Sequence, residues 1–163
     1  MGFKREAVRG SEMATNVNER TIEVILPNQI GYERIAMASS ASFAKMFGFS
    51  PARIEDLKTV VAEAAVNAMQ HGNKGRPDAR VIIRMNLEND TIYVTVTDDG
   101  EGIKKIYPKP DIDRIIDNLD PATGFGLFLI NQLVDEVDFN IRTEKGNGLR
   151  MAIKKSKSDR GRV

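Results

Sequence analysis

A mostly apolar helix with three polar residues along one line is the sequence feature that most limits how this chain can fold. The stretch VVAEAAVNAMQHGNKG, residues 60–75, is rich in Ala, Val and Met, yet Glu63, Asn67 and His71 recur at every fourth position. Four residues advance about 400° around an α-helix, so the three side chains follow one slowly drifting stripe. The stripe places a carboxylate, an amide and an imidazole together on a helix that is otherwise suited to packing under a sheet.

Caps and periodicity place this helix in an α+β domain. Ser50 as N-cap and Pro51 at the first helical position predict its start, and Gly72 predicts its end. The element order β–α–α–β–β–loop–α–β–β predicts an α+β sandwich, with helices packed on one face of a mixed, mostly antiparallel sheet. Other helices are predicted at residues 28–47 and 124–137, with a short one at 111–119, and strands at residues 20–27, 79–90 and 91–100 and in a closing hairpin over 138–155.

Composition excludes several classes of function. With 24 basic and 23 acidic residues, the net charge of +1 gives no electrostatic basis for capturing nucleic acid or an anionic membrane. The absence of cysteine excludes disulfides and thiolate metal sites, and the single histidine excludes a histidine-rich site. No apolar run approaches the roughly 18 residues of a membrane span, so we expect a cytoplasmic protein. We expect one domain over residues 20–155, a flexible arm over 1–19 and a basic tail over 156–163.

Two glycine motifs carry the remaining chemical signal. VTDDGEGI, residues 96–103, runs a strand into Asp98, Gly100 and Gly102, where glycines allow the backbone to approach a flat ligand. Taken alone, this motif is better explained by an ordinary hairpin turn, because Asp and Gly are common turn residues. TGFGLFLI, residues 123–130, opens a helix with a glycine pair whose free N–H groups suit phosphate, and helix capping is the alternative explanation.

The ordered combination of these motifs resembles the GHKL ATPase superfamily. EAAVNAMQHGNKG, then DDGEG, then GFGLFLINQLVDEV look most like the anti-sigma-factor serine kinases. The resemblance covers about residues 20–155, nearly the whole expected domain. It implies an ATP-binding fold with a bound Mg²⁺ and a lid over the nucleotide.

The resemblance assigns roles to the helical stripe. Asn67 resembles the asparagine whose side-chain oxygen binds Mg²⁺, and Glu63 resembles the family's general base, which takes a proton from the attacking hydroxyl. A backbone-bonded asparagine and a salt-bridging surface glutamate are the alternatives. Sensor histidine kinases usually carry Asn in place of Glu63, so Glu63 favours serine phosphorylation or hydrolysis. His71 is interpreted as structural, because a histidine at a helix end also offsets the helix dipole.

The glycine motifs correspond to the purine and the lid. Asp98 resembles the carboxylate that accepts a hydrogen bond from the adenine amino group, with Gly100 and Gly102 letting the backbone lie against the ring. Gly124 and Gly126 resemble the hinge of an ATP lid and a phosphate cradle. The polar segment 104–123, with three prolines, would be that lid.

The final hairpin departs from the family pattern. The family's last strand often carries a Gly-Thr pair near adenine, whereas KGNGLRM offers Gly146–Asn147 or Gly148–Leu149, depending on the alignment. Asn147 could supply the polar group that contacts adenine, and Leu149 could not.

The resemblance implies an ATP-dependent serine protein kinase and anti-sigma factor. Its substrate would be an anti-anti-sigma (STAS) protein, a sigma factor would be a second partner, and the chain would be a homodimer. A nucleotide-binding switch with little or no kinase activity is the alternative. A detached histidine-kinase catalytic domain fits the fold but not Glu63.

Overall fold

The computed structural model describes residues 20–100, 125–143 and 146–156. Several predictions concern residues outside these ranges: the arm over 1–19, the lid over 104–123 with its short helix, Gly102, Gly124 and nearly all of the basic tail. Within the described residues, no helix is long and apolar enough to cross a membrane.

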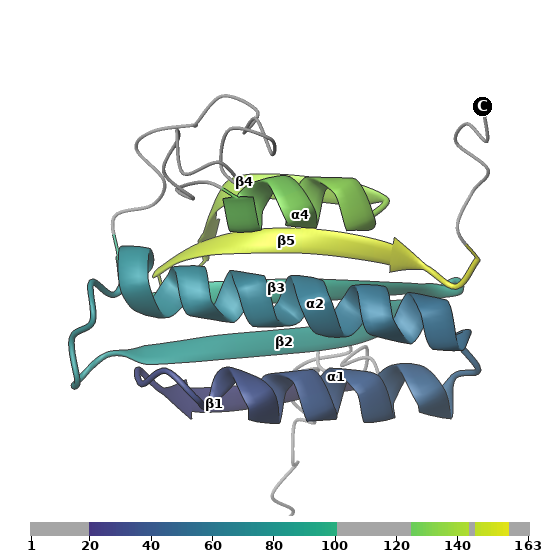
Figure 1. Cartoon of the computed structure of the whole chain (residues 1–163), viewed down its shortest axis with the longest axis horizontal. Helices are drawn as coiled ribbons and strands as arrows, with labels where there is room; N and C mark the ends of the chain where they lie inside the picture. Colours follow the sequence, from purple (N-terminus) through teal and green to yellow (C-terminus); the bar gives the residue numbers. More distant parts are fainter. Residues whose placement is uncertain (1–19, 101–124, 144–145, 157–163) are drawn as a thin grey trace, which may run out of the picture.

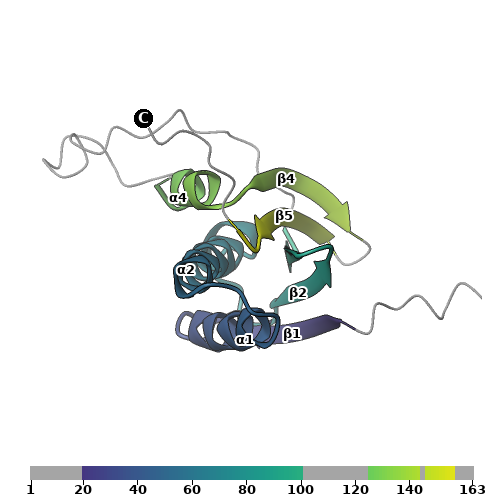
Figure 2. The same cartoon turned by 90° about the vertical axis from the view of Figure 1, so that its right-hand side faces the viewer.

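The described strands form one antiparallel sheet in the order β1-β2-β3-β5-β4. The helices lie on one face of this sheet, with α2 between α1 and α4 (Figures 1 and 2). The predicted architecture is therefore confirmed. The strands are β1 Thr21–Pro27, β2 Arg80–Glu88, β3 Thr91–Asp98, β4 Glu136–Thr143 and β5 Gly146–Lys154.

The two halves of the predicted central helix differ in geometry. Helix α2, Pro51–Asn67, begins as predicted, with the Ser50 hydroxyl accepting a hydrogen bond from the Arg53 amide at 3.3 Å. The α-helix ends at Asn67 and not at Gly72, because a π-helical turn, η1 Ala68–Gly72, follows. The wider turn is closed by the backbone N–H of Asn73, which donates to the carbonyl of Ala68 at 2.7 Å. Single π-helical turns are rare and occur frequently at functional sites.

Two further helices of the described residues, α1 and α4, are shorter than predicted. Helix α1, Glu33–Met46, starts five residues after the predicted start at Asn28, because Gly31 has a φ of +112°, which no α-helix contains. Helix α4, Phe125–Leu133, ends before residue 137 because Glu136 already pairs with β5 as the first residue of β4. The turn at Gly31 and the pairing of Glu136 with β5 therefore set these two helix ends, although the apolar periodicity continues beyond them.

Alternation along the strands sets the direction of Asp98. In β2 and β3 every second side chain is an apolar one buried against the helices. These side chains are Val81, Ile83, Met85, Leu87, Ile92, Val94 and Val96. Side chains two residues apart point to the same face of a sheet. Asp98 continues the even-numbered series at the end of β3, so it faces the helical layer.

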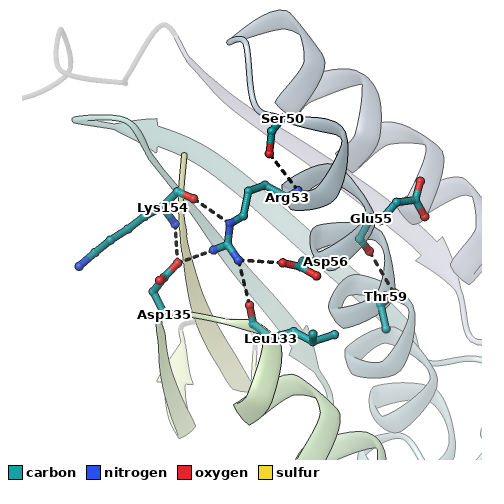
Figure 3. Close-up of polar contacts among 8 residues, drawn as sticks. All are labelled: Ser50, Arg53, Glu55, Asp56, Thr59, Leu133, Asp135 and Lys154. Carbon is teal, nitrogen blue, oxygen red and sulfur yellow. Dashed lines mark hydrogen bonds and ion pairs between the residues drawn. The ribbon is translucent and has the colours of Figure 1, made fainter. Parts of the chain in front are cut away.

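A buried arginine holds α4 against α2 (Figure 3). Arg53, 3% exposed, donates from Nη2 to Asp135 at 2.5 Å and from Nη1 to the Leu133 carbonyl at 3.3 Å and to Asp56 at 2.8 Å. Its Nε donates to the carbonyl of Lys154 at 3.0 Å. The C-terminal end of α4 is thereby fixed at the N-terminal end of α2, so the two helices run antiparallel.

Candidate nucleotide-binding site

The stripe on α2 meets the first described turn of α4. An added Cβ on Gly126 would lie 2.6 Å from Glu63 Oε2 and 3.3 Å from Asn67 Nδ2. Glu63 and Asn67 are therefore brought together beside Gly126. The first N–H groups of a helix lack partners within the helix and carry its positive dipole end. A carboxylate, an amide and the first described turn of α4 consequently share one place.

The Asn67 amide is suited to a ligand. Its Nδ2 is buried and has no hydrogen-bond partner among the described residues, although the great majority of buried polar atoms have one. The nitrogen and oxygen of an amide exchange places by rotation about one bond, so the same group can present its oxygen to a hard cation. The residues present at this point therefore fit the Mg²⁺ that the fold family implies.

His71 does not share this location. It lies in the π-helical turn, where the four-residue spacing no longer repeats the stripe, and its side chain is exposed. The stripe therefore consists of Glu63 and Asn67 only. The structural role predicted for His71 remains a prediction.

The end of β3 packs closely on the π-helical turn. A Cβ on Gly72 would lie 2.1 Å from Asp98 Oδ2, and a Cβ on Gly100 would lie 2.2 Å from the carbonyl oxygen of Gly72. Only residues without a side chain allow this approach. The Asp98 carboxylate also accepts a hydrogen bond from the Gly100 amide at 2.7 Å.

The environment of Asp98 disfavours its charged form. Burial raises the pKa of the carboxyl group, and the nearby charge of Asp99 raises it further. The Gly100 N–H and the charge of Arg76 lower the pKa without cancelling the rise. A half-buried carboxylate with a raised pKa gains most from a ligand that donates a hydrogen bond.

The final hairpin places Asn147, and not Leu149, beside Asp98. Asn147 is the register partner of Asp98, and its Nδ2 donates to the carbonyl of Gly100. Leu149 pairs with Val96 and is buried in the core. Of the two alignments left open by the sequence, the structure therefore puts Gly146–Asn147 at the site.

Gly146 is required by this arrangement. Its φ is +143°, and an added Cβ would lie 2.0 Å from the carbonyl oxygen of Asp98. Asp99 is exposed, and its carboxylate accepts from the backbone amide of Arg80 at 3.3 Å.

Sequence interpretation missed one buried pair of asparagines. Asn73 is completely buried, and its Oδ1 accepts from the Asp99 amide at 2.8 Å. Its Nδ2 donates to the side chain of Asn28 at 3.1 Å. The only sequence signal was an asparagine directly after the helix in HGN, which reads as an ordinary turn residue.

The site thus has two halves that α2 and η1 join. Glu63, Asn67 and the start of α4 suit the phosphates of a nucleotide and a cation. Asp98 and the glycines at the end of β3 suit a flat base with an exocyclic amino group.

The chain is similar to known proteins over most of its length. The family described as "Histidine kinase-like ATPase domain" matches residues 26–153. The serine-protein kinase RsbW of Bacillus subtilis is 32% identical over 143 residues, which cover 85% of this chain and 86% of the relative. The anti-sigma F factor of Oceanobacillus iheyensis is 31% identical over 134 residues, covering 77% of this chain and 86% of the relative.

A solved structure supports the fold. The crystal structure of the RsbU and RsbW domains of a Mycobacterium tuberculosis protein superimposes with a TM-score of 0.58 at 17% identity. The match covers 82% of this chain and 32% of that one. The chain belongs to the family of histidine kinase-like ATPase domains that includes the RsbW serine-protein kinases and the anti-sigma F factors.

Proposed function

We propose that this protein is an ATP-dependent serine protein kinase that also acts as an anti-sigma factor. The observation that carries the proposal is the position of Glu63 beside Asn67 and Gly126, at the first described turn of α4. The names of the relatives, serine-protein kinase and anti-sigma F factor, support both parts of it. A module that only binds nucleotide would need Asn67 and Asp98 but has no use for a base.

Each half of the site has a distinct task in this mechanism. Asp98 accepts a hydrogen bond from the adenine amino group, and guanine offers no such donor at that position. Asn67 holds the Mg²⁺, which when bound neutralises charge on the phosphates. The N–H groups at the start of α4 donate to phosphate oxygens.

Glu63 handles the proton of the acceptor serine. The serine oxygen forms a bond to the γ-phosphorus while the bond from that phosphorus to the β,γ-bridging oxygen breaks, and ADP leaves. The hydroxyl proton passes to a carboxylate oxygen of Glu63. Positioning and charge neutralisation supply most of the rate, with the base adding roughly 10²–10⁴-fold.

The partners follow from the same family. We propose an anti-anti-sigma (STAS) protein as the phosphorylated substrate, a sigma factor as the sequestered partner, and a cytoplasmic location. Homodimerisation is also proposed. Apolar side chains exposed along β1 and α1 support it, because β1 is one of the two outer strands of the described sheet. These side chains are Ile22, Ile25, Ile35 and Met46.

Phosphoryl transfer to any STAS protein that is found encoded near its gene tests the proposal. Glu63→Gln should keep Mg·ATP binding near the wild-type value and slow transfer at saturating ATP by roughly 10²–10⁴-fold. Glu55→Gln is the matched control, because Glu55 is an exposed glutamate of the same helix that pairs with Lys58. A Glu63→Gln variant with the wild-type rate would remove Glu63 as the base. A wild-type protein that binds ATP and transfers no phosphate would favour the nucleotide-switch function.

A further inference from the structure

Asn73 holds the turn that carries Asp98. Its Oδ1 accepts from the backbone amide of Asp99, while its Nδ2 donates to the Arg80 carbonyl at 3.0 Å and to Asn28 Oδ1 at 3.1 Å. A reversed amide would place its NH₂ group against a donor and its oxygen against two acceptors. The orientation is therefore fixed by its partners. Because Asn73 is 0% exposed, solvent water does not reach its side chain to replace these bonds.

The backbone of Asn73 bonds the other side of the site. Its backbone N–H donates to the Ala68 carbonyl and so closes the π-helical turn. Its backbone carbonyl accepts from the Arg76 backbone amide at 3.0 Å and from Arg76 Nε at 3.2 Å. Ala68 directly follows Asn67, the predicted Mg²⁺ ligand. One residue thus bonds the segment next to the phosphate half through its main chain and the adenine half through its side chain.

A second amide supports the same turn from the sheet. Asn147, on β5, donates to the Gly100 carbonyl, while Asn73 receives the Asp99 amide. Between these two contacts the Asp98 carboxylate is held by the Gly100 N–H. The backbone of the turn is therefore bonded from the helical side and from the neighbouring strand.

We propose that Asn73 is the positioning residue for purine selection. It fixes where the Asp98 carboxylate stands relative to the π-helical turn, and so decides whether an adenine amino group meets it at hydrogen-bonding distance. The inference rests on the proposed ATP binding and extends it to a residue that does not touch the nucleotide. Without the Asn73 side chain, the Asp99 amide loses its acceptor, and the turn can move away from η1.

Two alanine variants separate positioning from stability. Asn28 belongs to the same network, since its Nδ2 donates to the carbonyls of Arg76 at 2.9 Å and Met69 at 3.3 Å, but it makes no bond to the turn. Asn73→Ala and Asn28→Ala should both lower the melting temperature. Asn73→Ala should also weaken ATP binding about ten-fold, the effect of one lost hydrogen bond, and reduce the ratio of ATP to GTP affinity. Asn28→Ala should leave both quantities within about two-fold of wild type.

Amide hydrogen exchange without nucleotide gives the independent readout. The Asp99 amide should exchange faster in Asn73→Ala than in wild type and in Asn28→Ala. Unchanged Asp99 exchange in Asn73→Ala, or equal changes of the ATP to GTP ratio in both variants, would overturn the inference. If Asn73→Ala does not fold, Asn73→Ser replaces it, because a hydroxyl is too short to reach the Asp99 amide. If the wild type itself does not prefer ATP, the proposed function fails, and exchange at Asp99 still decides whether Asn73 holds the turn.

Discussion

The Asp98 carboxylate fills the space in which a side chain on Gly72 would begin. A Cβ there would lie 2.1 Å from Oδ2 and 2.7 Å from Oδ1. Gly72 is the last residue of the π-helical turn that follows Asn67, so this contact places the end of β3 next to the helix that bears the stripe. The contact between Asp98 and Gly72 therefore fixes the position of the adenine half of the site relative to the phosphate half.

Asp98→Asn should stabilise the nucleotide-free protein at neutral pH and weaken ATP binding. Burial raises the pKa of Asp98 in the folded state. The protonated carboxyl group therefore contributes fully to folding stability below the pKa of the unfolded state, about 3.9, and this contribution is lost as the pH rises through the folded pKa. An asparagine does not titrate. The gain in melting temperature over wild type should consequently be larger at pH 7 than at pH 4.

Calorimetry and thermal unfolding check both parts of this prediction. The affinity for Mg·ATP should fall by about ten-fold or more, because a hydrogen bond to a charged group is lost. Asp78→Asn is the control, since Asp78 is exposed in the loop before β2. Equal ATP affinity in Asp98→Asn would contradict the adenine assignment, and a stability difference independent of pH would contradict the electrostatic argument.

Asn67→Ala should also separate stability from function. The substitution removes a buried amide nitrogen that has no partner among the described residues, and it places the best helix former at the end of α2. The nucleotide-free protein should therefore melt at the same temperature or higher. Isothermal titrations of ATP with and without Mg²⁺ should show the magnesium-dependent part of the affinity disappear. A variant whose affinity still rises with Mg²⁺ to the wild-type extent would exclude Asn67 as the ligand.

Gly126→Ala should harm phosphoryl transfer more than folding. The new Cβ would lie 2.6 Å from Glu63 Oε2, the far end of a flexible side chain, so the carboxylate can move aside at little cost. Alanine also favours the helix over glycine by up to about 1 kcal/mol. We expect an unchanged or higher melting temperature together with a slower transfer, because Glu63 is displaced from the serine. Wild-type transfer in this variant would show that the position of Glu63 is not critical.

The local parts of this fold could be predicted from the sequence, and the long-range parts could not. Ser50 and Pro51 placed the start of α2 correctly because a cap acts through neighbouring residues. The helical run ends at Gly72 as predicted, but its last turn, Ala68–Gly72, is π-helical, which the sequence did not indicate. Its π-helical turn depends on Asn73 being held by Asn28 and Arg80, and Asn28 lies 45 residues away in the chain.

Site residues divide in the same way. Glu63, Asn67 and Asp98 lie within short motifs, and the structure places each beside a glycine of another segment. Arg53 gave no signal, because an arginine in the first turn of a helix normally lies in solvent, and its partner Asp135 is 82 residues away. Gly102, Gly124 and the lid lie outside the described residues, so their roles stay predictions.

Arg53→Met should lower the free energy of unfolding far more than is expected for an arginine in the first turn of a helix, which normally lies in solvent. The variant leaves Asp135, whose side chain is 7% exposed, as a buried charge without its ionic partner. Breaking a buried ion pair on one side typically costs about 3–5 kcal/mol. Lys58→Met removes an exposed pair with Glu55 on the same helix and should cost less than about 1 kcal/mol. Urea unfolding at pH 7 measures both values.

A double variant decides whether the unpaired charge causes the loss. Asp135→Asn removes the charge while its side-chain oxygen can still accept from the Lys154 amide, which donates to Asp135 at 2.8 Å. Arg53→Met with Asp135→Asn should therefore be more stable than Arg53→Met alone. The remaining loss reflects the carbonyls of Leu133 and Lys154, which no longer receive the guanidinium. If the double variant is as unstable as the single one, packing and these carbonyl bonds, and not the buried carboxylate, make Arg53 necessary.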